Sequence, residues 1–127
     1  MIVVDASAAL SALLNADAAR RALSDQQLHA PHLIDTELAS ALRRRVRAQQ
    51  LDADVGWSIL DTWRRLAMTK YPGVFLLDRM WELRENLSAY DASYVALAER
   101  LGCNLLTADA RLSRAQNIRC PVTVVPG

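Results

Sequence analysis

Four acidic residues, spread over most of the chain, occupy positions that suit metal-ion chemistry. Asp5 and Asp109 each follow a short apolar run, Asp91 follows a helix-start signal, and Glu37 lies within a helical pattern. If the fold brings these carboxylates together, each close pair repels by a few kcal/mol at an effective dielectric of about 20. A divalent cation offsets that repulsion, and oxygen ligands without nearby His or Cys select Mg²⁺ or Mn²⁺. Such a site suits phosphodiester hydrolysis, because the cation acidifies water and neutralises a phosphate.

Each acid also has an ordinary structural use. Asp5 and Asp109 suit helix N-caps, and Asp91 suits the first turn of a helix, where a negative charge is favourable. Residue types and spacing alone leave the metal site and these structural uses open. Other acids, such as Asp52 and Glu99, follow no strand end. We assign those acids to solvated faces or caps.

The elements that must position the four acids alternate between strand and helix patterns. Predicted strands cover residues 2–4, 27–30, 74–77, 104–107 and 121–125. Predicted helices cover residues 6–14, 34–42, 52–68, 78–86 and 88–101, with a helical turn at 108–112. Apolar strands with few polar interruptions, alternating with helices, indicate an α/β fold with a parallel sheet covered on both faces. Asp5 and Asp109 then lie at the carboxyl ends of strands, which is the edge where such sheets bind ligands.

Length and composition indicate one domain spanning residues 1–127. A chain of 127 residues, of which 52% are hydrophobic and 23% charged, is large enough for a single core. No run approaches the roughly 18–20 apolar residues of a membrane span, and the apolar N-terminus lacks a basic leader and is interrupted by Asp5. We therefore expect a cytoplasmic protein without a membrane partner. Cys103 and Cys120 fit that compartment as reduced, buried residues.

The charge balance excludes a strongly basic nucleic-acid-binding domain, because the net charge is only +1. The distribution of the basic residues is more informative than their number. All of them except Lys70 are Arg, whose guanidinium group suits bidentate contact with phosphates. Most of these Arg residues have a simpler use on solvated helix faces.

Four short runs contain the acidic residues and follow one another in a familiar order. They are Ile2-Val3-Val4-Asp5-Ala6-Ser7, Asp35-Thr36-Glu37, Tyr90-Asp91-Ala92-Ser93-Tyr94 and Leu106-Thr107-Ala108-Asp109-Ala110-Arg111. This ordered set resembles the pattern of PIN-domain ribonucleases. The chain is similar to the VapC toxins of type II toxin–antitoxin modules, and the resemblance spans essentially its whole length. One such motif alone is weak support, whereas the complete set is specific.

The resemblance implies a fold and an activity. The fold is a PIN-like three-layer α/β/α domain with a central parallel sheet of four to five strands. The activity is endonucleolytic cleavage of RNA with one or two Mg²⁺ or Mn²⁺ ions. Asp5, Asp91 and Asp109 would ligate metal in such an enzyme. Glu37 would ligate it directly or through water, and would orient or deprotonate the attacking water.

The resemblance also implies supporting residues and partners. Ser7 and Thr107 would support the acidic cluster by hydrogen bonds. A cognate VapB antitoxin would cover the site, and the toxin would form homodimers and toxin–antitoxin hetero-oligomers. Arg84 is a candidate contact for RNA or antitoxin, with a surface ion pair as its alternative. Trp57 and Leu60 give the predicted 52–68 helix a second apolar patch, either for a partner or for core packing from two sides.

Alternative functions share parts of this pattern. An aspartate-dependent phosphatase or a receiver-like domain also gathers acids at strand ends. Phosphatases of that kind usually have a second Asp two positions after the first, where Ser7 stands here. Receivers need a Lys near the site, and Lys70 is expected in a loop between a helix and a strand. A catalytically silent PIN-like binding or regulatory module is the alternative from a different class, and the intact acids argue against it.

Overall fold

A five-stranded sheet forms the centre of the structure, which is a computed structural model describing residues 1–14 and 17–127. Its strands are β1 (Ile2–Val4), β2 (Leu28–Pro31), β3 (Thr69–Tyr71), β4 (Asn104–Thr107) and β5 (Val122–Val124). The strand order is β3-β2-β1-β4-β5, and every neighbouring pair is parallel. Val3 in the central strand lies opposite His29 on one side and Leu105 on the other. The predicted α/β class and parallel sheet are therefore confirmed.

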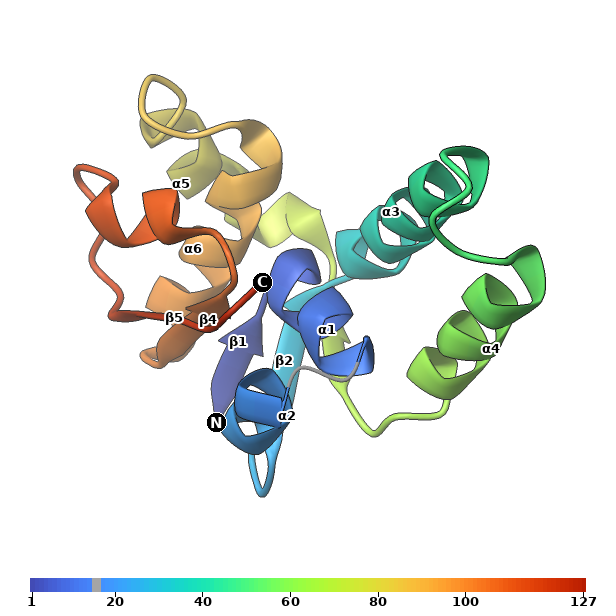
Figure 1. The fold of residues 1–127 in the computed structure, drawn as a ribbon. Coiled ribbons are helices and arrows are strands. Elements are labelled where there is room, and N and C mark those ends of the chain that lie inside the picture. Colours follow the sequence, from blue (N-terminus) through green and yellow to red (C-terminus); the bar gives the residue numbers. More distant parts are fainter. Residues whose placement is uncertain (15–16) are drawn as a thin grey trace.

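Helices cover both faces of the sheet (Figure 1). On one face lie α1 (Ala6–Leu13) and α2 (Asp17–Leu23), and on the other lies α6 (Ala89–Leu101), which contacts β1, β2 and β4. A short 3-10 helix, η1 (Gly73–Leu76), and α5 (Leu77–Glu82) pack against α6. The chain runs from β1 toward β3 and then returns to β4 on the other side of β1. Right-handed crossovers in opposite directions place helices on opposite faces, and the switch point lies between β1 and β4.

Two further helices form a hairpin that projects beyond the sheet (Figure 1). They are α3 (Leu33–Arg47) and α4 (Ala53–Arg64), and α3 also contacts α1. Ile34, Leu38 and Leu42, at helical spacing, form the buried stripe of α3. Asp35 fixes the hairpin to the sheet, since it accepts hydrogen bonds from Trp63 Nε1 at 2.8 Å and from Lys70 Nζ of β3 at 2.7 Å.

The core surrounds the central strands, and Val3, Leu105 and Val95 of α6 are completely buried in it. Two local signals fix the limits of α6. The Ser88 Oγ accepts a hydrogen bond from the Asp91 N–H at 3.2 Å, as the predicted cap requires, and Gly102 ends the helix in the left-handed region at φ 66°. None of the helices in the two described ranges is both long and apolar enough to cross a bilayer. Cys103 and Cys120 are buried free thiols, as expected.

One predicted strand is wrong, the helix predicted at 52–68 is too long, and strand β3 and helix α2 were missed. Residues 74–77 form no strand, because η1 and the start of α5 occupy them and leave Val74 and Phe75 about two-thirds exposed, at 64% and 65%. The third strand is instead β3, which brings Lys70 into the sheet rather than a loop. The helix predicted at 52–68 correspondingly ends at Arg64. The short helix α2 had no counterpart among the predicted elements.

Candidate active site

Asp5 lies directly beyond the carboxyl end of β1 and is almost completely buried, at 5% exposure. It is the N-cap of α1, because its Oδ1 accepts a hydrogen bond from the Ala8 N–H at 2.9 Å. The same oxygen accepts from Ser7 Oγ at 2.7 Å, and Oδ2 accepts from Thr107 Oγ1. The capping role considered for this residue is therefore real. It does not exclude a metal role, because carboxylate oxygens have further lone pairs.

Ser7 and Thr107 join the ends of β1 and β4 around that carboxylate. Their hydroxyl oxygens lie 3.2 Å apart. The Ala108 N–H donates to Ser7 Oγ at 2.9 Å, and the Asp109 N–H donates to Thr107 Oγ1 at 3.0 Å. Thr107 is completely buried. These bonds hold the loop after β4 against the start of α1, which is the supporting geometry expected for the two hydroxyls.

Glu37 reaches the site from the second turn of α3, at the border of its buried stripe. Its Oε1 accepts a hydrogen bond of 2.5 Å from the hydroxyl of Tyr94, which is 2% exposed and belongs to α6. This bond links the projecting hairpin to the helix on the opposite face of the sheet. It also fixes the direction of the Glu37 carboxylate, because the buried phenol ring has little freedom to move.

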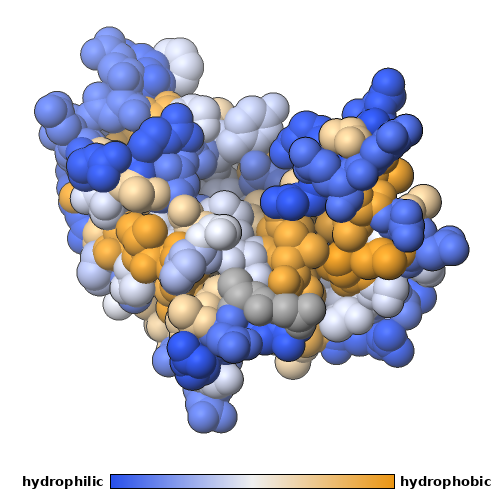
Figure 2. Space-filling model, viewed as in Figure 1, coloured by the Kyte–Doolittle hydropathy of each residue, from blue (hydrophilic) through white to orange (hydrophobic). Residues whose placement is uncertain are grey.

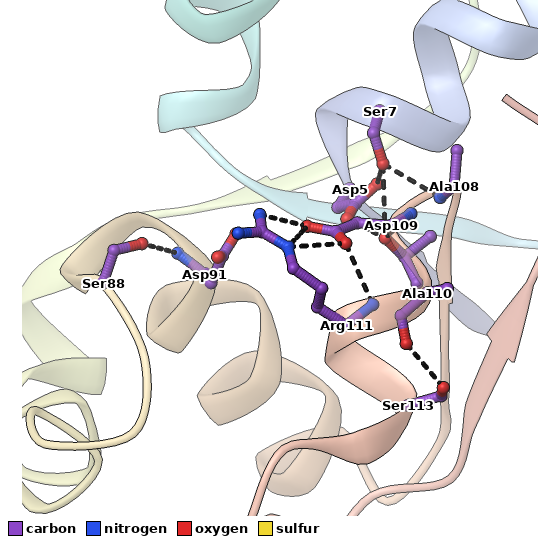
Figure 3. Close-up of polar contacts among 10 residues, drawn as sticks. Asp5, Ser7, Ser88, Asp91, Ala108, Asp109, Ala110, Arg111 and Ser113 are labelled. Carbon is purple, nitrogen blue, oxygen red and sulfur yellow. Dashed lines mark hydrogen bonds and ion pairs between the residues drawn. The ribbon is translucent and has the colours of Figure 1, made fainter.

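Asp91, at the start of α6, and Asp109, after β4, lie on either side of the Arg111 guanidinium (Figure 3). Asp91 occupies the first turn of α6. Asp109 is the N-cap of the 3-10 helix η2 (Ala110–Arg114), and its Oδ1 accepts from the Arg111 N–H at 3.0 Å. The Arg111 guanidinium also pairs with this carboxylate, through Nε to Oδ1 at 3.0 Å and through Nη2 to Oδ2 at 2.7 Å.

The four acids influence one another's protonation. Burial raises the pKa of Asp5, and the charge of Asp91 raises it further, against the hydrogen bonds from Ser7 and Thr107 that lower it. The pKa of Glu37 is raised by burial, and the charges of Asp91 and Asp5 add to that shift although the Tyr94 hydroxyl opposes it. Mutual repulsion of this kind requires proximity, so four distant parts of the sequence converge at this edge.

The pKa values of the two acids beside Arg111, Asp91 and Asp109, are shifted in opposite directions. Burial and then the charge of Asp109 raise the pKa of Asp91. The hydrogen bonds from Arg111 lower the pKa of Asp109, whose carboxylate is thereby neutralised locally. Within residues 1–14 and 17–127, the only one of the four acids in an ion pair is Asp109. Three of the four carboxylates therefore lie close together without a positive partner of their own.

The carboxylates are not arranged as a finished coordination shell. In the described part of the chain, no three acidic, histidine or cysteine side chains are close enough to hold one metal ion as they stand. Two of the four acids are directed toward other partners, Glu37 toward Tyr94 and Asp109 toward Arg111. Side-chain rotation would be needed to direct both carboxylates to one point.

The surface around this edge is hollowed between the α5–α6 side and the projecting hairpin, and both rims are hydrophilic (Figure 2). The Arg84 guanidinium is stacked 4.7 Å from the centre of the Trp81 ring. It also donates to the Trp81 carbonyl at 2.9 Å and, among the residues described, forms no ion pair, so that alternative is wrong. Its contact with RNA or antitoxin stays a prediction.

Tyr94 and Arg111 are the site residues that the sequence did not reveal as participants. Both lie inside the motif runs, but no role followed from residue type alone. Tyr94 is three residues after Asp91, so a helix places it one turn farther along the same side. That spacing could have indicated Tyr94, whereas the pairing of Arg111 with Asp109, two residues away across the start of a 3-10 helix, follows no such rule.

Comparisons with known proteins agree with this geometry. The PIN domain family model matches residues 2–118. The chain is 60% identical over 126 residues to the ribonuclease VapC9 of Mycobacterium tuberculosis, with 99% of each chain covered. A solved structure from Pyrobaculum aerophilum matches with a TM-score of 0.75 at 24% identity, over 95% of this chain and 81% of that chain.

A second solved structure, VapBC2 from Rickettsia felis bound to a promoter DNA fragment, matches with a TM-score of 0.71 at 14% identity. The match covers 97% of this chain and 99% of that chain. At these identities the two solved structures show a shared fold and nothing further. The family model and the sequence relative also show the family of the chain, because each spans nearly its whole length. The chain belongs to the PIN-domain family and, within it, to the VapC ribonucleases.

Proposed function

We propose that residues 1–127 act as a single-domain, Mg²⁺- or Mn²⁺-dependent endoribonuclease, the toxin of a type II toxin–antitoxin module. One observation carries the proposal. Asp5, Glu37 and Asp91 come from three separate helical regions, lack ion-pair partners among the described residues, and each has its pKa raised by burial and by another acid. Such a cluster of like charges is costly without a cation, and the capping bond of Asp5 and the hydrogen bond of Glu37 to Tyr94 do not remove that repulsion.

The residues present fit a hard divalent cation. All four candidate ligands are carboxylates, which suit Mg²⁺ and Mn²⁺ rather than zinc. Asp5, Asp91 and Asp109 would hold the ion, and Glu37 would approach it directly or through water. When bound, the cation would neutralise phosphate charge and make a water molecule more acidic.

The chain's own residues would supply positioning and proton transfer. Ser7 and Thr107 hold the Asp5 carboxylate in one orientation. Glu37 is half-buried, and its raised pKa makes it a stronger base than an exposed glutamate. It would accept the proton of the water that attacks the phosphorus atom, and Tyr94 would keep its carboxylate directed into the site. Cleavage then breaks the phosphodiester bond of an RNA chain.

The proposal is tested by incubating purified protein with mixed RNA in Mg²⁺, in EDTA and in Mn²⁺. We expect cleavage with either cation and none with EDTA. Asp5→Asn keeps the size of the side chain and removes its charge, so cleavage should fall by at least about 100-fold. Asp54→Asn, on the exposed first turn of α4, is the matched control and should cleave normally. Full activity of Asp5→Asn, or activity in EDTA, would reject the mechanism.

The same assay separates the alternatives. A catalytically silent PIN-like module would bind RNA or protein partners without producing cleavage ends under any of these conditions. An aspartate-dependent phosphatase or receiver would instead become phosphorylated, and Lys70 is unsuited to that role because it pairs with Asp35. Cleavage of RNA with the stated metal dependence contradicts both alternatives.

We further propose that a VapB-type antitoxin binds this chain, since the chain belongs to the VapC ribonucleases and a solved structure of the same fold is a VapBC2 assembly. An apolar cavity of about 330 Å³ between α1, α2 and the end of α4 offers a docking surface. Apolar surface appears beside the hairpin in Figure 2. Trp57, 57% exposed on α4, borders a second groove with Leu60 and Leu42, so it is not packed into the core from two sides.

Homodimerisation and a cytoplasmic location complete the proposal. Val74, Phe75, Leu77 and Trp81 are all more than half exposed and belong to neighbouring turns, η1 and α5. A patch of this kind suits association with a second copy of the chain. Light scattering of the purified chain and of Phe75→Glu tests the dimer. We expect a dimer that becomes a monomer in the variant, and a monomeric wild-type chain would contradict this part of the proposal.

A further inference from the structure

Arg111 has two unusual features for a surface arginine. Its guanidinium makes a forked contact with Asp109, yet its side chain is 81% exposed. Figure 3 shows the same guanidinium between the carboxylates of Asp109 and Asp91. It therefore lies between two of the proposed metal ligands, where its positive charge offsets the repulsion between the two carboxylates. In this arrangement Arg111 neutralises Asp109 in the way that a bound cation would.

Arg111 also lies at a cavity that reaches the acidic cluster. The cavity has a volume of about 390 Å³ and is lined by Asp91, Asp109 and Arg111 together with Asn86, Leu87 and Leu112. Its volume is within the roughly 300–1,000 Å³ typical of ligand sites. A lining that combines polar side chains with two leucines suits a nucleotide, whose sugar-phosphate is polar and whose base has an apolar face.

We propose that Arg111 alternates between two partners, Asp109 when no divalent cation is bound and an RNA phosphate at this cavity when one is. This inference rests on the proposed function and assigns a substrate-binding role within it. The ion pair with Asp109 is exposed, so it is weak enough to exchange. A cation that takes the Asp109 carboxylate removes the partner of Arg111. The free guanidinium then has the planar donor pair that binds phosphate in a bidentate manner.

The proposal predicts that one substitution has opposite effects on two measurements. Arg111→Gln removes the competitor for Asp109, so Mn²⁺ should bind about two- to fivefold more tightly in calorimetry. The same change removes a phosphate contact, so the KM for RNA at saturating Mn²⁺ should rise about ten- to hundredfold. A residue needed only for folding would not strengthen metal binding. The fold should persist, because the Arg111 N–H that caps η2 belongs to the backbone.

Two further variants complete the experiment. Arg114→Gln is the matched control, since Arg114 lies on the same 3-10 helix and the substitution removes the same charge. It should leave the KM for RNA and the affinity for Mn²⁺ within about twofold of wild type. Arg111→Lys keeps the charge but loses the planar fork, so its KM should lie between those of wild type and Arg111→Gln.

The outcomes are distinguishable. Arg111→Gln with the Mn²⁺ affinity of Arg114→Gln would overturn the competition for Asp109. An unchanged KM in Arg111→Gln would overturn the phosphate contact. If the wild-type chain itself neither binds Mn²⁺ nor cleaves RNA, the proposed function fails and this inference fails with it. The inference alone fails when the wild type binds and cleaves and the two Gln variants behave alike.

Discussion

The hydrogen bond from Tyr94 to Glu37 gives a specific expectation for Tyr94→Phe. This substitution removes one oxygen atom from a side chain that is 2% exposed and leaves the ring and its packing in place. The lost bond joins α6 to α3, with 2.5 Å between the hydroxyl and Oε1. Both stability and activity should fall, because the bond holds the hairpin and also directs the Glu37 carboxylate.

The size of the effect follows from the burial of the two groups. A hydrogen bond to a charged group contributes about 1.5–3 kcal/mol when it is buried, and the partial exposure of Glu37 reduces this to about 1–2 kcal/mol. For a domain of this size that corresponds to a fall in the unfolding temperature of roughly 3–8 °C. Loss of orientation of Glu37 should lower kcat for RNA about tenfold or more. Calorimetric unfolding and RNA cleavage measure the two effects.

Tyr90→Phe is the matched control, since Tyr90 lies one turn earlier on α6 and is 59% exposed. Its unfolding free energy should change by less than about 0.5 kcal/mol. Combining Tyr94→Phe with Glu37→Gln should give less than the sum of the two single effects, because they remove the same bond. Equal stability and equal kcat in Tyr94→Phe and Tyr90→Phe would refute the reasoning.

Three other expectations concern protonation, the hairpin and the helix end. In EDTA, the raised pKa values of Asp5, Glu37 and Asp91 mean that the folded state binds more protons than the unfolded state above about pH 4. Their contribution to stability is present below that pH and is lost as pH rises through the raised values. The free energy of unfolding measured in urea should therefore fall less between pH 4.5 and 8 in Asp91→Asn than in wild type. An equal fall in the two proteins would contradict this expectation. Asp35→Ala leaves the buried Trp63 N–H without its acceptor and should cost about 1–2 kcal/mol in the same assay; no change would show that the hairpin is held by apolar packing alone. Gly102→Ala should cost about 1 kcal/mol, because φ there is 66°, and a neutral result would contradict the left-handed helix end.

The sequence predicted the central elements because their patterns are local. Residues 2–4 and Leu105-Leu106 are apolar and buried at the middle of a parallel sheet, where both faces are covered. The start and end of α6 followed from Ser88 and Gly102, whose roles depend on neighbouring residues only. Such features need no knowledge of the rest of the fold.

The third strand could not be predicted in the same way. β3 consists of Thr69, Lys70 and Tyr71 at the edge of the sheet, so it needs no apolar run. The apolar residues that follow it, Val74 and Phe75, lie on the surface. An apolar run therefore predicted a strand where the chain forms a turn of helix, because hydrophobicity alone does not distinguish a buried position from an exposed patch.

The candidate site was predicted in position but not in detail. Strand ends predicted Asp5 and Asp109 at one edge, helix patterns allowed Glu37 and Asp91 to point toward it, and the resemblance made the set of four specific. The orientation of each carboxylate depends on residues from other elements, as Tyr94 on Glu37 and Arg111 on Asp109 show. These pairings are set by tertiary packing, which the spacing of residues along the chain does not specify.

Calorimetric titration with Mg²⁺ and Mn²⁺, without RNA, tests most directly whether the four acids form one cation site. Wild-type protein should bind, and Asp91→Asn should bind at least about tenfold more weakly. Asp54→Asn should bind as wild type does, because Asp54 lies on α4, outside the proposed ligand set. Equal affinity in wild type and Asp91→Asn, or no binding by the wild type, would contradict the cation site on which the mechanism depends.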